Sequence, residues 1–195
     1  MNVGLAMLPS IDAEVEELVK ICGPQGIRKS NPLNKEEMVE KIVTVNALNS
    51  VASAQETVAL AWKDIEANVQ MKRARIRSLL YHWEAVLRTV QELRKNSESE
   101  RTVRYVIGHQ MQARASVTPD GRVVLDIGAN IYVDFSYDEA EERLRGALEM
   151  GEKSALKLLS CYEECKRNIV TSDINISQLH NYSVEMRATL MKTAS

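Results

Sequence analysis

The stretch Val103–Ser136, VRYVIGHQMQARASVTPDGRVVLDIGANIYVDFS, determines how the rest of this chain can fold. Apolar and polar residues alternate along most of it, and side chains on a strand point to opposite faces in turn. The alternation therefore predicts strands with one buried face. The segments Thr118–Gly121 and Gly128–Asn130 contain the proline, glycine and asparagine that are typical of turns. The stretch predicts two β-hairpins within residues 99–136, with mostly helix on either side.

The bulk composition narrows the function classes. The chain has 195 residues and a net charge of −2, which argues against a general nucleic-acid binder. Aromatic residues make up only 5%, which favours an elongated helical fold over a compact globule. We see no signal peptide and no apolar run near the roughly 20 residues that span a bilayer, so we expect no membrane association. The 3 cysteines lack paired spacing, which indicates reduced thiols and a cytoplasmic protein.

Residues 35–98 are predicted to form the first helix of a coiled coil. Asn34 and Glu37 match a capping box, and no proline or glycine follows before Lys95. A helical segment of about 60 residues without a break is typical of coiled coils. Its apolar residues recur every three or four positions, from Trp62 to Leu93, with Lys72 as an interruption.

Residues 137–195 are predicted to form the second helix. Ser136 and Glu139 repeat the capping-box pattern, and a regular seam follows, which Gly146 and Gly151 weaken locally. Two helices of similar length joined by hairpins should fold back as an antiparallel coiled coil. If both helices rise about 1.5 Å per residue, Lys72 and its basic neighbours lie beside Glu163 and Glu164. The expected fold class is mainly α with a small β part.

Residues 1–34 are predicted to form an irregular arm that contains a short helix. Gly23–Gly26 and Asn31-Pro32 break this arm. We favour a loosely attached arm, and the alternative is a functional element.

One end of the predicted coiled coil carries little charge. Glu56 is the only charged residue between Ile42 and Trp62, and the opposing segment 174–195 has three. Because coiled-coil exteriors are normally charged, this end suggests a surface for other polypeptides, with packing against a partner helix as the alternative. The candidate binding residues at this end are Ile42, Val43, Val45, Tyr182, Val184, Met186, Leu190 and Met191.

The sequence contains no pattern that indicates catalysis. It has no glycine-rich nucleotide loop and no zinc-protease motif, and its three histidines lie on different predicted elements. Cys161 and Cys165 are one helical turn apart, but the seam position of Cys165 favours core packing over a metal site. We therefore expect no enzyme, no cofactor and no metal. The basic cluster Lys72–Arg77 is interpreted as a solvated face with interhelical ion pairs, and an RNA-binding helical arm is the alternative.

Several short motifs resemble those of a known family. The layout of helix, two hairpins and helix is that of the alpha-class prefoldin subunits. The sequence is most similar to the eukaryotic subunit 3 branch of that family. The matching motifs are Gly128-Ala129-Asn130-Ile131, Val133-Asp134-Phe135, Tyr137-Asp138-Glu139-Ala140, Val170–Asn175 and Asn181–Val184.

The resemblance implies a co-chaperone subunit that uses no ATP. Two alpha-class and four beta-class chains would form a hexamer whose hairpins build a central double barrel. The coiled-coil tips would hold unfolded clients, such as actin and tubulin, for the cytosolic chaperonin. A self-associating structural coiled coil without clients is the alternative. The residues expected at the subunit contacts are Val123, Leu125, Ile127, Ile131, Val133 and Phe135.

Overall fold

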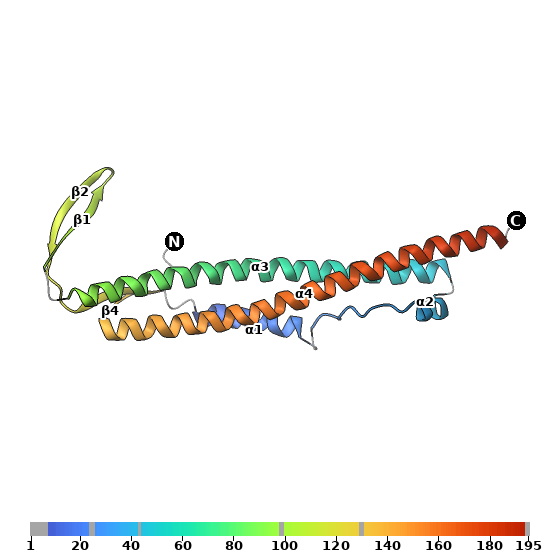
Figure 1. The fold of residues 1–195 in the computed structure, drawn as a ribbon, viewed down its shortest axis with the longest axis horizontal. Helices are drawn as coiled ribbons and strands as arrows, with labels where there is room; N and C mark the ends of the chain where they lie inside the picture. The colour runs from blue at the N-terminus through green and yellow to red at the C-terminus, as the bar shows by residue number, and fades with distance from the viewer. Residues whose placement is uncertain (1–7, 24–25, 43, 98–99, 129–130, 194–195) are drawn as a thin grey trace. The chain divides into compact units, whose positions relative to one another are not determined.

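A computed structural model describes residues 8–23, 26–42, 44–97, 100–128 and 131–193. It confirms a mainly helical fold with two antiparallel β-hairpins (Figure 1). Along the chain, the hairpins follow one long helix and precede the other. The elements are α1 (Leu8–Cys22), α2 (Lys35–Lys41), α3 (Val45–Lys95), β1 (Arg101–Gly108), β2 (Met111–Val117), β3 (Arg122–Gly128), β4 (Ile131–Ser136) and α4 (Tyr137–Thr193).

The chain divides into two compact units. The first unit contains residues 75–154 and the described residues up to Asp12. The second unit contains Ala13–Ala74 and Ala155–Ser195. Because α3 and α4 each contribute to both units, each unit has its own length of paired helix.

In the first unit, α3 and α4 pack through a mixed seam of large and small residues. Trp83 is 2% exposed and Leu144 is 1% exposed. Gly151 makes room for this contact, since a Cβ added there would lie 2.8 Å from Leu80 Cδ2 and 3.3 Å from Trp83 Cζ3. The glycine therefore permits close helix packing at a position where helix propensity alone would disfavour it.

The start of α4 is fixed by the predicted capping box. The backbone N–H of Glu139 donates to Ser136 Oγ at 3.3 Å, and the backbone N–H of Ser136 donates to Glu139 Oε2 at 3.0 Å. These hydrogen bonds from Ser136 hold the pKa of the Glu139 carboxyl below its ordinary value. Arg94, near the end of α3, pairs with Asp138 at 2.8 Å and with Glu141 at 3.3 Å. The capping box and these ion pairs fix the point at which the chain enters its second long helix.

The strands form two separate two-stranded sheets. β1 pairs with β2, and β3 pairs with β4, with Val123 opposite Phe135 and Leu125 opposite Val133. The proline-containing turn Thr118–Gly121 lies between the two sheets, where Gly121 adopts φ 76°. The first hairpin instead turns at His109 and Gln110, where Gln110 has φ 64°.

The predicted unbroken first helix is wrong, because two separate helices lie within residues 35–98. Helix α2 ends at Lys41 and α3 begins at Val45. The break falls in the run Ile42-Val43-Thr44-Val45, whose β-branched side chains lose rotational freedom in a helix. Thr44 Oγ1 accepts the backbone N–H of Ala47 at 3.2 Å, so it caps α3.

The other predicted cap is partly confirmed. Asn34 caps α2 by accepting the backbone N–H of Glu36 at 3.3 Å. The Glu37 side chain, which the capping-box prediction also involves, lies outside the described residues.

Candidate functional site

The second unit contains an N-terminal arm that is packed against the helix pair rather than loosely attached. In α1, Val15 is 0% exposed, Leu18 is 4% exposed and Cys22 is 6% exposed. Ion pairs join Glu14 to Lys72 of α3 and Glu16 to Lys157 of α4. The prediction of a loose arm is therefore wrong for α1, because its apolar residues are buried and its acidic residues pair with both long helices.

The packed arm also changes the partners of the basic cluster. Lys63 pairs with Asp173 at 3.5 Å, a pairing that fits the expected antiparallel register. Lys72, however, pairs with Glu14 of α1, and the Arg73 guanidinium lies 4.7 Å from the centre of the Tyr162 ring. The Arg73–Tyr162 contact fits the expected register, but the arm supplies the ion-pair partners, since Lys72 pairs with Glu14 and Glu164 pairs with Lys29.

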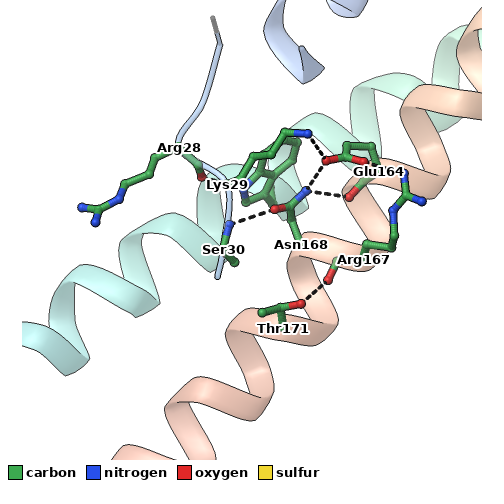
Figure 2. Close-up of polar contacts among 8 residues, drawn as sticks. Arg28, Lys29, Ser30, Glu164, Arg167, Asn168 and Thr171 are labelled. Atoms are coloured by element: carbon green, nitrogen blue, oxygen red, sulfur yellow. Dashed lines mark hydrogen bonds and ion pairs between the residues drawn. The ribbon is translucent and has the colours of Figure 1, made fainter. Parts of the chain in front are cut away.

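After α1, residues 27–34 run in an extended conformation along α4. They are held by three buried polar residues, named here the α4 ladder: Asn168, Ser172 and Asn175, which are 4%, 0% and 0% exposed. The backbone N–H of Ser30 donates to Asn168 Oδ1 at 2.8 Å (Figure 2). The hydroxyl groups of Ser30 and Ser172 hydrogen-bond to each other.

Asn175 makes the most contacts within the α4 ladder. Its Oδ1 accepts the backbone N–H of Leu33 at 3.0 Å, and its Nδ2 donates to the backbone carbonyl of Asn31 at 2.8 Å. On the α3 side of the segment, Trp62 Nε1 donates to the carbonyl of Arg28 at 3.2 Å. The two long helices thus bind mainly the backbone of the extended segment, and the space between them is named here the groove.

An ion pair strengthens the attachment at the start of this segment. Lys29 Nζ lies 2.8 Å from Glu164 Oε1, and Arg167 contacts the other carboxylate oxygen at 2.5 Å (Figure 2). Hydrogen bonds from Lys29, and then from Arg167 and Asn168, lower the pKa of Glu164 to about 2, although partial burial of the carboxyl opposes this shift. Glu164 is therefore ionised throughout the physiological pH range.

Helix α2 covers an apolar region between α3 and α4. Met38 and Ile42 are 5% and 4% exposed and pack in one cluster with Leu48 and Leu179, named here the α2 cluster. The Tyr182 hydroxyl donates to the carbonyl of Ile42 at 3.2 Å. The chain therefore covers part of its own charge-poor end.

The structure divides the eight predicted polypeptide-binding residues into different environments. Ile42 is buried, and Val45, Tyr182 and Met186 are half-buried. Val184, Leu190 and Met191 are 56%, 54% and 72% exposed. Val43 lies outside the described residues. Among the members that the structure describes, Val184, Leu190 and Met191 are the ones more than half exposed.

Sequence reasoning missed the α4 ladder. Ser172 was assigned to the helical seam, and Asn168 and Asn175 lie four residues before it and three after it. Polar residues at this spacing on one helix face are a signal for a buried polar partner, because buried polar groups are nearly always hydrogen-bonded.

The three cysteines meet beside the arm. Cys22, Cys161 and Cys165 are free and buried, as expected for core packing at Cys165. A hydrogen bond with Cys165 and burial raise the pKa of the Cys22 thiol, and burial raises the pKa of Cys161 to about 12. An adjacent cavity of about 300 Å³ is lined by Cys22, Cys161, Lys29, Lys157 and Glu164, among others. Its thiols are protonated and unreactive at neutral pH.

The predicted assembly residues in the first unit lie on one hairpin. Leu125 and Phe135 are 9% and 8% exposed, and the Arg143 guanidinium lies 5.0 Å from the Phe135 ring centre. Val123, Ile127 and Val133 are half-buried, whereas Ile131 is 53% exposed. The other hairpin leaves its large apolar residues exposed: Val103, Tyr105, Val106, Ile107, Met111 and Val117.

Other kinds of site find no support in the described part of the chain. His82, His109 and His180 are exposed on separate elements. Within the described ranges, no group of three or more His, Cys, Asp or Glu side chains could hold a metal ion. None of the helices described combines the length and apolar character needed to cross a membrane.

Comparison with known proteins points to one family. The model of the family described as "Prefoldin subunit" matches residues 63–182, more than half of the chain. Mouse "Prefoldin subunit 3" is 24% identical over 128 residues, which are 65% of this chain and 65% of the mouse protein. "Probable prefoldin subunit 3" of Schizosaccharomyces pombe is 26% identical over 133 residues, covering 68% of this chain and 78% of the relative.

Solved structures were also matched. One of them is the cryo-EM structure of filamentous PFD from Methanocaldococcus jannaschii, in which a chain is similar with a TM-score of 0.37 and 20% identity, covering 71% of this chain and 99% of that one.

Proposed function

This chain belongs to the prefoldin subunit family, and from that membership we propose that it is one subunit of a hetero-oligomeric co-chaperone. In this proposal its hairpins contact a second alpha-class subunit and the beta-class subunits. The end formed by the start of α3 and the end of α4 binds non-native polypeptides, of the actin and tubulin kind, for delivery to the cytosolic chaperonin. The cycle requires no ATP and no catalysis by this chain.

The observation that carries the assembly proposal is the exposed hairpin β1–β2. Val106 is 69% exposed, Ile107 is 61% exposed and Met111 is 63% exposed. A two-stranded hairpin is at best marginally stable in water without a covered apolar face, and its outer edges have unpaired backbone groups. Further strands from other subunits would cover these side chains and pair these edges.

The observation that supports polypeptide binding is the accessible apolar surface on α4. Val184, Leu190 and Met191 are all more than half exposed within a segment of low charge. Non-native chains present varied apolar segments, and flexible methionine side chains adapt to such partners. This surface is where the proposed clients would bind.

Assembly is tested by Ile107→Asp, co-expressed with the other subunits. Because Ile107 is 61% exposed in the single chain, the added charge should leave its helices intact but prevent entry into the complex. Thr118→Asp, at an exposed polar position just after β2, is the control and should assemble normally. Native mass spectrometry would measure incorporation, and normal incorporation of Ile107→Asp would contradict the proposed assembly surface.

Client binding is tested by the double variant Val184→Ser with Met191→Ser. Each lost apolar contact removes of order 1 kcal/mol, so suppression of client aggregation should weaken by about tenfold or more. Leu156→Ser with Val170→Ser removes two exposed apolar groups, 67% and 55% exposed, from α4 outside the proposed surface. Equal protection by both double variants would refute this location, and a discrete homo-oligomer without client binding would favour a structural coiled coil.

A further inference from the structure

The groove between α3 and α4 in the second unit already contains a peptide. Its occupant, named here the docked segment, is residues 27–42 of the same chain. We propose that this groove is a binding site for extended segments of non-native polypeptides, and that the docked segment is a displaceable internal occupant that competes with them. This inference rests on the proposed client-binding function and adds the site and its regulation.

Between Arg28 and Leu33 the groove binds mainly backbone, and the Lys29 ion pair and the Ser30 hydroxyl are the side-chain contacts. The α4 ladder and Trp62 together form hydrogen bonds with backbone groups of Arg28, Ser30, Asn31 and Leu33. By contrast, the side chains of Arg28, Lys29, Asn31 and Pro32 are exposed. A receptor that binds backbone accepts many sequences, which is the requirement for a protein that meets unfolded chains of different kinds.

Beyond Leu33, the groove also holds apolar side chains of the docked segment. Leu33 packs at the edge of the α2 cluster, and Met38 and Ile42 are buried within it. Met38 lies on α2 and Ile42 at its C-cap, so the groove takes an extended backbone followed by one short helix, and a non-native polypeptide can supply both. The docked segment therefore has the chemistry of the proposed ligand.

An empty groove has an energetic cost. Asn168, Ser172 and Asn175 are at least nine-tenths buried with the segment in place, and they use it as a hydrogen-bond partner. When the segment leaves, water must replace it as their partner, so the net energy of these hydrogen bonds is lost. The backbone of another polypeptide can supply the same donors and acceptors.

Both ends of the docked segment are attached to the rest of the chain independently of the groove. Before it, α1 is held by Val15, Leu18 and the ion pairs of Glu14 and Glu16. After it, the chain continues into α3 at Val45. The segment can leave the groove while staying tethered at high local concentration, so its return would help to expel a bound client.

The test uses the full chain within the assembled complex. The variant Ser30→Pro with Met38→Ser removes one donor to the α4 ladder and one apolar anchor, and it changes no residue of α3 or α4. Asn31→Ala is the matched control, because its side chain is exposed and only its carbonyl accepts a hydrogen bond. Hydrogen exchange of residues 27–42 measures release, and a reduced, carboxymethylated, permanently unfolded protein is the binding probe.

The release variant should show faster exchange over residues 27–42 and bind the probe about tenfold more tightly, as expected if the segment fills the groove about 90% of the time. Faster exchange with unchanged or weaker probe binding would overturn the inference and leave the segment with a purely structural role. In that case the parent would still bind the probe. Absence of probe binding by the parent itself would instead refute the proposed function.

A second measurement on the unaltered chain does not depend on folding of the variant. A synthetic peptide of residues 27–42 should compete with the unfolded probe for the parent complex. The same peptide with serine at the positions of Leu33, Met38 and Ile42 should compete at least tenfold more weakly. Failure of the unaltered peptide to compete would also overturn the inference.

Discussion

Two stretches of α4 hold their neighbours with different chemistry. In the first unit, α4 buries Leu144 and Ala147, and Gly151 lies against Trp83 of α3. In the second unit, the α4 ladder holds a third segment through hydrogen bonds to backbone. Apolar periodicity therefore explains a helix pair, whereas polar residues within the seam indicate where an additional chain segment binds.

Among the substitutions that test this difference, Asn175→Leu should lower the free energy of unfolding most. This change leaves the N–H of Leu33 and the carbonyl of Asn31 without their partner, and it places a larger side chain in a site that is 0% exposed. We expect the free energy of unfolding to fall by about 3 kcal/mol. Urea unfolding followed by circular dichroism would measure the loss.

The control for this change is Asn181→Leu, at an exposed position of the same helix. It should alter the free energy of unfolding by less than about 0.5 kcal/mol. Equal effects at the two positions would mean that the ladder contributes nothing beyond ordinary helix surface.

The apolar stretch is tested by a pair of glycine substitutions. Gly146→Ala meets no atom within 4 Å and should raise the free energy of unfolding by about 0.5–1 kcal/mol through helix propensity. Gly151→Ala has the same propensity gain, but its Cβ would lie 3.3 Å from the buried Trp83 ring. Overpacking of about 1–3 kcal/mol should outweigh that gain and leave a net loss of about 1 kcal/mol. Thermal unfolding would measure the change in stability of both variants. Stabilisation by Gly151→Ala would show that the seam is loosely packed.

The helix pair and the hairpins were predictable because their signals are local. Alternation within Val103–Ser136 indicated the strands, and the Ser136–Glu139 pattern indicated the start of α4. Spacing of three and four residues identified seam members such as Leu144, Leu158 and Leu179, which are all buried. These patterns reflect side-chain direction, which the sequence period specifies.

The arm and the helix break were not predictable with the same rules. Four β-branched residues at 42–45 lower helix propensity only weakly, and propensity is readily overridden by packing. The docking of residues 27–34 depends on hydrogen bonds to α4 residues more than 130 positions away, such as Ser30 to Asn168. Glycine and proline in the arm mark an irregular chain, but they do not show what it contacts.

A small effect, one that depends on pH, is expected at Glu164, which joins the arm to the polar stretch of α4. Lys29 lies 2.8 Å away and its side chain is 48% exposed, so solvent screens the pair. Glu164→Gln should therefore lower the free energy of unfolding by only about 1 kcal/mol at pH 7. Because the folded-state pKa is about 2 and the ordinary value is 4.5, this contribution is complete above about pH 4.5 and disappears as the pH falls toward 2.

Urea unfolding at several pH values between 7 and 2.5 would measure this dependence. The difference between the parent and Glu164→Gln should shrink as the acid range is entered, whereas the exposed neighbour Glu163→Gln should show little difference at any pH. A difference that stays constant with pH would assign the effect of Glu164 to packing or to its neutral hydrogen bonds. A shrinking difference would establish that this carboxylate holds the arm in its groove by charge, provided that residues 27–33 also lose protection against hydrogen exchange at low pH, relative to an unstructured peptide at the same pH.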